Sequence, residues 1–271
     1  MRELLAMTLL LGLAAGCRTA HAPAAPRPFT VYNALLYRQQ PDFAGLPFPR
    51  IRLVYGQELW AKGIDRAQPD LATVQTTITA LPKLDAPVVL DIEHWPVHGD
   101  EATVAASLAK YLEVLRAARG ARPDLAFGYY GVAPLRDYWT PVSKDPAKLA
   151  AWRTANERVT PLAKEVDAVF PSLYTFYDDP AGWEVYARAN LAAARRYGKP
   201  IYAFLWPQYH DSNKQLAGQD LPADGWARQL AVCRELADGV VIWGGYQQDW
   251  DEQAPWWQAT RRFLAALPRA R

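Results

Sequence analysis

Two acidic side chains stand one residue apart at the end of an apolar run, in the segment VVLDIEH at residues 88–94. Side chains two positions apart on a strand point to the same face, so Asp91 and Glu93 are expected to project together. Leu90 and Ile92 would then face the opposite side. Two carboxyls held close in a partly buried site separate their pKa values, so that one keeps a proton near neutral pH. A protonated acid beside an ionised one can cleave a glycosidic bond.

The spacing of this pair favours one scheme of glycoside hydrolysis over others. Most glycosidases place two carboxyls about 5–9.5 Å apart, usually on different strands. An i, i+2 pair on one strand fits better with substrate-assisted hydrolysis, in which the 2-acetamido group of the sugar is the nucleophile. One acid would protonate the leaving oxygen, and its neighbour would orient the acetamido group. The alternatives at this point are a structural ion pair with Arg or Lys, or a cation site.

The rest of the chain supplies elements that could position the pair. Seven apolar, β-prone runs alternate with amphipathic helical stretches. The runs lie near residues 29–36, 50–55, 86–92, 125–131, 167–174, 199–206 and 239–243, and the helical patterns cover about 70–82, 101–119, 147–165, 182–197, 222–237 and 255–267. Alternation of this kind calls for parallel strands with right-handed crossovers. We predict an α/β fold with a single domain over residues 29–271, a distorted TIM-like (β/α) barrel of about seven parallel strands. A doubly wound open sheet is the alternative, but no Gly-rich phosphate loop follows the first strand.

Aromatic and polar residues gather where the predicted strands end. The strand ends read LDIEHWP, GYYGVAP, FPSLYTFYDD, YAFLWPQYHD and VIWGGYQQDWDE. Barrel enzymes build their active sites at the carboxyl ends of the strands. Rings at a site rim can stack on sugars, although large aromatics also fill cores. A glycan is therefore the ligand class that this rim predicts.

Composition and motifs disfavour several other classes of function. The formal net charge is only +2, which disfavours a nucleic-acid partner. His94 and His98 flank Pro96, so the helix that would align them on a metal is not expected. No Gly-x-Ser-x-Gly elbow indicates a serine hydrolase. We predict no metal, no cofactor and a monomeric protein.

The first residues resemble a bacterial lipoprotein leader rather than part of the fold. Residues 4–15 are apolar but too short to span a bilayer, and LAAGC at 13–17 resembles a lipobox. Residues 1–17 are thus predicted to be a signal peptide, with Cys17 as the lipidated first residue of the mature chain. An ordinary cleaved signal peptide is the alternative. Residues 18–28 are rich in Pro and Ala and predict an extended tether. The protein is expected in the bacterial cell envelope, contacting the membrane only through this anchor.

Taken in order, the motifs resemble those of the animal hyaluronidase family. The segment Asp91-Ile92-Glu93-His94-Trp95-Pro96 is similar to the family's Asp-x-Glu-x-Trp-Arg-Pro. Further similar segments are FTVYN at 29–33, IRLVY at 51–55, GYYG at 128–131 with Tyr138 beyond it, PSLY at 171–174 and GVVIWG at 239–244. The resemblance spans roughly residues 29 to 267.

This resemblance implies a distorted barrel of about seven strands and a set of roles for named residues. Glu93 would be the general acid and then the general base, and Asp91 would steady the acetamido group with Tyr174 donating a hydrogen bond to it. Lining of the N-acetylhexosamine subsite is implied for Tyr55, Tyr138 and Trp243. The aromatic strand ends add Tyr129 and Trp206 as substrate-binding candidates. The resulting hypothesis is a retaining hydrolase of N-acetylhexosamine-containing glycans.

Three departures from the family pattern bear on the substrate. Trp95 is followed directly by Pro96, without the intervening Arg, the disulfide cysteines of the animal enzymes are missing, and residues 210–213 lack basic side chains. Fold and chemistry therefore transfer better than substrate does. Two other functions stay open: a sugar-binding lipoprotein without catalysis, and a barrel hydrolase whose nucleophile is Asp178 or Asp179.

Overall fold

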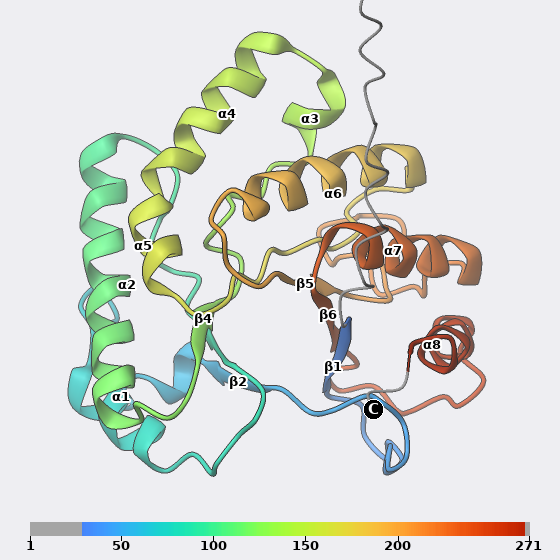
Figure 1. Cartoon of the computed structure of the whole chain (residues 1–271), viewed down its shortest axis with the longest axis horizontal. Helices are drawn as coiled ribbons and strands as arrows, with labels where there is room; N and C mark the ends of the chain where they lie inside the picture. Colours follow the sequence, from blue (N-terminus) through green and yellow to red (C-terminus); the bar gives the residue numbers. More distant parts are fainter. Residues whose placement is uncertain (1–28, 269–271) are drawn as a thin grey trace, which may run out of the picture.

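The computed structural model describes residues 29–268, in which strands and helices alternate along the chain (Figure 1). The strands are β1 (Thr30–Leu35), β2 (Arg52–Tyr55), β3 (Val88–Asp91), β4 (Phe127–Tyr129), β5 (Tyr202–Leu205) and β6 (Gly239–Gly244). The helices are α1 (Leu71–Thr79), α2 (Glu101–Ala121), α3 (Trp139–Ser143), α4 (Pro146–Arg158), α5 (Thr160–Glu165), α6 (Pro180–Arg195), α7 (Ala223–Leu236) and α8 (Pro255–Ala265), with a short 3-10 turn at Gly56–Glu58. The α/β alternation expected from the sequence is confirmed.

The strands form two parallel sheets of three, in the orders β1-β6-β5 and β2-β3-β4. Six strands in two sheets replace the predicted barrel of about seven strands. The missing strand is the segment 167–175, which pairs through isolated parallel bridges with residues 130 and 201–209. Pro171 lies in this segment and has no N–H to donate to a sheet, so a continuous ladder cannot form there. Another parallel bridge, Asn33↔Arg50, links β1 to the residues before β2.

Two apolar clusters divide the strand side chains by face. Leu90 and Ile92 belong to a large cluster that also contains the buried faces of the helices, such as Trp183 of α6 and Trp226 of α7. Val89 belongs to a second, smaller cluster. Its members come from, or lie directly next to, every strand and the segment 167–175: Tyr32, Ala34, Ile51, Leu53, Val89, Tyr130, Ala168, Phe170, Tyr174, Phe204, Trp206 and Val241. The strands therefore share one interior, and the expected outward orientation of Leu90 and Ile92 is confirmed.

The predicted helix at 147–165 is two helices, α4 and α5, rather than one. Pro161 lies in the first turn of α5, where its missing N–H costs nothing and its fixed φ favours a new helix start. Helix α3 was not predicted, and the remaining helices lie within a few residues of their expected bounds.

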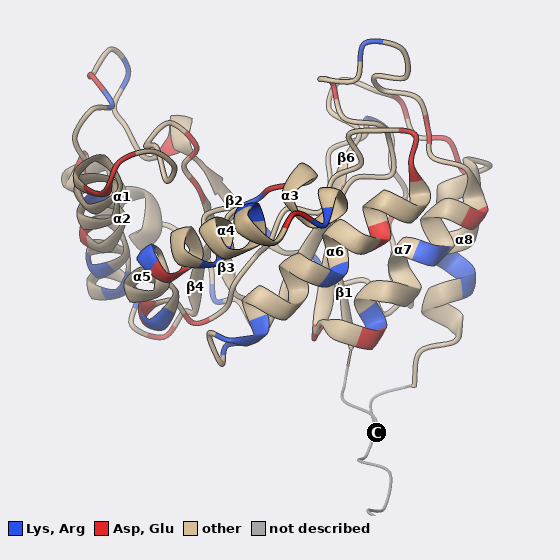
Figure 2. Ribbon diagram, turned by 90° about the horizontal axis from the view of Figure 1, so that it is seen from above, with Lys and Arg blue, Asp and Glu red and all other residues tan. Residues whose placement is uncertain are grey.

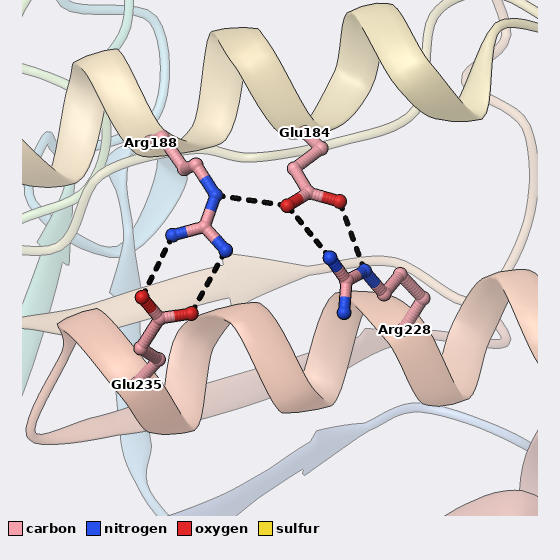
Figure 3. Close-up of polar contacts among 4 residues, drawn as sticks. All are labelled: Glu184, Arg188, Arg228 and Glu235. Atoms are coloured by element: carbon pink, nitrogen blue, oxygen red, sulfur yellow. Dashed lines mark hydrogen bonds and ion pairs between the residues drawn. The ribbon is translucent and has the colours of Figure 1, made fainter.

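Helices α6 and α7 lie side by side on the outside of the molecule and are joined by a cluster of four charged residues (Figure 3). Arg188 donates to Glu184 at 2.8 Å and to both carboxylate oxygens of Glu235 at 2.9 and 2.8 Å. Arg228 donates to both oxygens of Glu184, at 2.9 and 2.8 Å. These bidentate contacts fix the alignment of the two helices.

Charged residues of both signs are interspersed along the outer helices (Figure 2). Within residues 29–268, none of the helices is both long enough and apolar enough to span a bilayer. The predicted signal peptide, Cys17 and the tether lie outside the described residues.

Candidate active site

The carboxyl pair lies where β3 ends. Asp91 is the last residue of β3 and pairs in register with Tyr55, the last residue of β2. Ile92 is buried in the helix-side cluster, and Glu93 on its far side is exposed. From α2, the hydroxyl of Tyr111 donates to the Ile92 carbonyl at 2.9 Å and to the Trp95 carbonyl at 3.2 Å. The segment carrying Glu93 is thus anchored to α2 rather than being a free loop.

A cavity of about 190 Å³ opens beside Glu93. It is lined by residues that follow β3 and β4 together with one from the segment 167–175: Ile92, Glu93, Trp95, Pro96, Val97, His98, Tyr111, Tyr130, Gly131, Val132, Arg136 and Ser172. Because these segments come from the carboxyl ends of parallel strands, the cavity lies at the rim where barrel-type folds carry their sites.

Asp91 is a partly buried carboxyl group in an unusual environment. Its Oδ1 atom has no hydrogen-bond partner among the described residues. Burial and, to a smaller extent, the nearby charge of Glu93 together raise the pKa of Asp91 to about 7. Within residues 29–268, neither Asp91 nor Glu93 forms a salt bridge, so the ion-pair alternative does not describe them. Close to neutral pH, Asp91 is therefore present in both its protonated and its ionised form.

Tyr174 lies in the interior that the strands share, and its phenol is neutral. Burial raises its pKa well above the usual value, and Tyr130 and the charges of Asp91 and Glu93 act in the same direction. Its ring lies 5.9 Å from that of Tyr130 and is stacked at 25° on Trp243, also at 5.9 Å. A phenol that stays protonated is available as a hydrogen-bond donor beside the carboxyl pair.

Tyr55 and Trp243 join the two sheets at the rim. The Trp243 indole N–H donates to the Tyr55 hydroxyl at 3.2 Å, and burial raises the pKa of Tyr55. Trp206 packs edge-on against Trp243 with ring centroids 5.0 Å apart. Gly244 permits this approach, since its φ is +149° and a Cβ there would lie 2.7 Å from Trp206 Cδ1. These aromatic rings form one wall next to Asp91.

Two of the predicted substrate-binding tyrosines lie elsewhere. Tyr129 is buried on the helix side, where its hydroxyl donates to the Tyr111 carbonyl at 2.7 Å. Tyr138 donates to Asp179 at 2.9 Å and packs against Tyr177 and α6. The structure therefore brings together Glu93, Asp91, Tyr174, Tyr55, Trp243 and Trp206, but not Tyr129 or Tyr138.

Of the residues that line the cavity, only Glu93 was predicted as a site residue, and the others include Tyr130, Ser172 and Arg136. Tyr130 donates to Ser172 Oγ at 3.0 Å, and burial raises its pKa to about 12. The strand register held the signal for Tyr130, because Tyr129 pairs with the helix-facing Leu90, which puts Tyr130 on the face of Asp91. Arg136 lies 5.0 Å from the centre of the Phe176 ring, and no sequence pattern pointed to it.

The other acids considered as nucleophiles are engaged away from this cavity. Asp178 accepts a hydrogen bond from Tyr209 at 2.8 Å, and Asp179 caps α6 through the Gly182 N–H at 2.8 Å. In the part of the chain that the structure describes, no three His, Cys, Asp or Glu side chains are grouped so as to hold a metal ion. His94, which follows Glu93 in the sequence, is hydrogen-bonded to the Arg66 carbonyl at 2.9 Å.

Comparison with known proteins supports the fold. No protein-family model matches the sequence, and no curated protein matches it. Among solved structures, bee venom hyaluronidase in a monoclinic crystal is similar with a TM-score of 0.63 and 17% identity, covering 88% of this chain and 97% of that one. Bee venom hyaluronidase in complex with a hyaluronic acid tetramer is similar with a TM-score of 0.60 and 15% identity, covering 88% and 96%. This chain therefore has a hyaluronidase-like fold over nearly all of its described residues.

Proposed function

We propose that this protein is a retaining glycoside hydrolase that cleaves a glycan containing N-acetylhexosamine by a substrate-assisted mechanism. The observation that carries the proposal is the carboxyl pair: Asp91 has a buried, unpaired oxygen and a pKa raised to about 7, and its neighbour Glu93 lines a cavity together with Trp95, Tyr111 and Tyr130. Simple sugar binding does not need such a pair, whereas acid catalysis does. The hyaluronidase-like fold is consistent with this chemistry, and we infer that its two sheets, joined by bridges, act as one distorted barrel.

In the proposed first step, Glu93 gives its proton to the glycosidic oxygen while the acetamido oxygen attacks the anomeric carbon. The bond to the leaving sugar breaks, and the reducing-end fragment departs as an alcohol. The sugar left behind is a cyclic oxazolinium ion. Ionised Asp91 accepts the acetamido N–H and stabilises this positive charge, and Tyr174 donates to the acetamido oxygen. In the second step Glu93 removes a proton from water, which opens the ring with net retention.

The shared proton must move before the first step. In the free protein it resides on Asp91, because burial favours the neutral form there. A bound acetamido N–H would stabilise the ionised form of Asp91, and the proton that Asp91 releases would pass to Glu93. Substrate binding thus converts the pair into its reactive arrangement.

The test of this function is a panel of N-acetylhexosamine glycans, hyaluronan included, incubated with the purified mature protein and read by mass spectrometry. We expect cleavage of at least one glycan, retention of anomeric configuration by proton NMR, and inhibition by an N-acetylglucosamine thiazoline that mimics the cyclic ion. Cleavage without thiazoline inhibition would favour a conventional nucleophile. Binding without any product would favour a non-catalytic carbohydrate-binding protein.

The predicted anchor places this activity at a membrane surface. We infer that Cys17 is acylated and that residues 18–28 hold the domain away from the lipid, in the envelope of a bacterial cell. A glycan exposed in that compartment is then the natural substrate.

A further inference from the structure

A second cavity, of about 350 Å³, lies between the amino-terminal ends of α6 and α7. It shares no lining residue with the cavity beside Glu93. Its lining includes Tyr177 and Asp178 before α6, and Asp224, Arg228 and Gln229 on α7. Its volume is at the lower end of the ~300–1,000 Å³ that is typical of small-molecule sites.

Gln229 brings a buried hydrogen-bond acceptor to this cavity. Its side chain is only 6% exposed, and its Nε2 donates to Thr175 Oγ1 at 2.8 Å. The other end of the amide, Oε1, has no hydrogen-bond partner among the described residues. A buried unpaired acceptor is costly, and buried polar atoms are nearly always satisfied. A ligand that donates a hydrogen bond would satisfy it.

The charged groups of the cavity favour a neutral ligand with many donors. Asp178 accepts from Tyr209 through Oδ1, and Asp224 is exposed at the rim. Arg228 is the one cation in the lining, but Glu184 engages its Nε and Nη2 atoms (Figure 3). The cavity consequently presents acceptors to a ligand, and an anion would meet uncompensated carboxylates.

An aromatic surface adjoins these acceptors. Tyr177 is 38% exposed and Trp139 is 59% exposed, with ring centroids 4.7 Å apart. The Trp139 indole N–H donates to the Tyr177 hydroxyl at 3.1 Å, which holds the pair in place. Exposed rings next to a cavity offer flat apolar faces to the C–H side of a sugar ring.

We propose that this cavity is a secondary glycan-binding site that holds one neutral sugar ring against Tyr177, with a sugar hydroxyl donating to Gln229 Oε1. Acceptors for the remaining hydroxyls are Asp178 and Asp224. The site is distinct from the carboxyl pair and does not depend on the proposed hydrolysis. It would keep a glycan chain on the protein whether or not the chain is cut.

The experiment titrates triacetylchitotriose into the whole mature protein by calorimetry, in a Glu93→Gln background so that turnover does not interfere. Tyr177→Ala and Gln229→Met are each expected to raise the Kd at least tenfold. Tyr246→Ala is the matched control, since Tyr246 is 66% exposed but does not line the cavity, and its Kd should be unchanged. Thermal melting checks the fold, and the exposed position of Tyr177 keeps the test valid if Gln229→Met fails to fold.

No binding of chitotriose, or equal Kd values for Tyr177→Ala and its parent, would overturn the proposal. A hyaluronan tetrasaccharide should show no binding that depends on Tyr177, and equally tight Tyr177-dependent binding would overturn the preference for neutral sugars. Failure here is separable from failure of the proposed hydrolysis, because binding is measured without turnover and cleavage is measured with Tyr177 and Gln229 intact.

Discussion

Asp91 is a carboxyl group that the fold buries without giving its Oδ1 atom a hydrogen-bond partner. Such an arrangement lowers stability at neutral pH, because ionising a buried group costs free energy. Proteins keep strained or unsatisfied groups mainly where they serve a function, and perturbed carboxyls cluster at active sites. The charge of Glu93 adds to the free energy needed to ionise Asp91, because it raises the pKa of Asp91.

Asp91→Asn should stabilise the protein in a pH-dependent way. The folded-state pKa of about 7 lies above the ordinary value of 3.8, so the folded state binds the proton more tightly than the unfolded state. The wild-type free energy of unfolding therefore falls as pH rises from about 4 to about 7, by at most about 4 kcal/mol. Asn lacks this titration, so the gain in Tm should be near zero at pH 4 and largest above pH 7.

Denaturation scans from pH 4 to pH 8 check this expectation. Glu113→Gln, at an exposed carboxylate on α2, is the control and should give no such trend. A gain for Asp91→Asn that is independent of pH would show that Asp91 is ionised throughout and is not the proton-holding member of the pair.

At the scale of elements, close approach of β4 to the segment 167–175 makes the site possible. The segment brings Ser172 and Tyr174 to the interior, and it packs directly over Gly128. A Cβ on Gly128 would lie 2.2 Å from the Ala168 carbonyl oxygen, which is backbone and cannot turn away. Glycine at this position is what lets the two segments come together.

Gly128→Ala is accordingly expected to destabilise the fold by roughly 2–4 kcal/mol, as overpacking against backbone does. Gly120→Ala in α2 is the matched control, because a Cβ there meets nothing within 4 Å. That change should be neutral or stabilising by about 0.5–1 kcal/mol. Chemical denaturation of both variants measures the difference, and equal stabilities would refute the close approach.

Much of the secondary structure was predictable from periodicity, and the rest depended on contacts between distant segments. Runs such as residues 88–91 and 239–244 are strands in the structure, and Asp91 and Glu93 could be found from their spacing alone. The prediction of a single helix at 147–165 did not take into account that Pro161 favours a new helix start. The prediction of a strand at 167–174 did not take into account that Pro171 interrupts a ladder. Deciding whether Tyr129 or Tyr130 faces the site required the pairing register of β3 and β4. The sequence of one strand alone does not determine that register. Arg136 reaches the cavity only through tertiary packing.

At the scale of the whole molecule, the described residues have a hyaluronidase-like fold, and the sequence before them predicts a leader with a lipid anchor. Single acyl chains bind membranes weakly, so an anchor of this class needs more than one chain. Cys17→Ser should move the protein from the membrane fraction to the soluble fraction of an expressing bacterium. Mass spectrometry of the amino-terminal peptide checks the acylation. An unmodified peptide that begins at another residue would establish an ordinary signal peptide instead.

The most direct test of the central claim is the turnover of Glu93→Gln on the glycan that the wild-type protein cleaves. Glu93 is exposed, so the variant should fold with an unchanged Tm while its kcat/KM falls by at least ~10³, as expected for loss of a general acid. Turnover that survives this substitution undiminished would contradict the assignment of the Asp91–Glu93 pair as the reacting group of this protein.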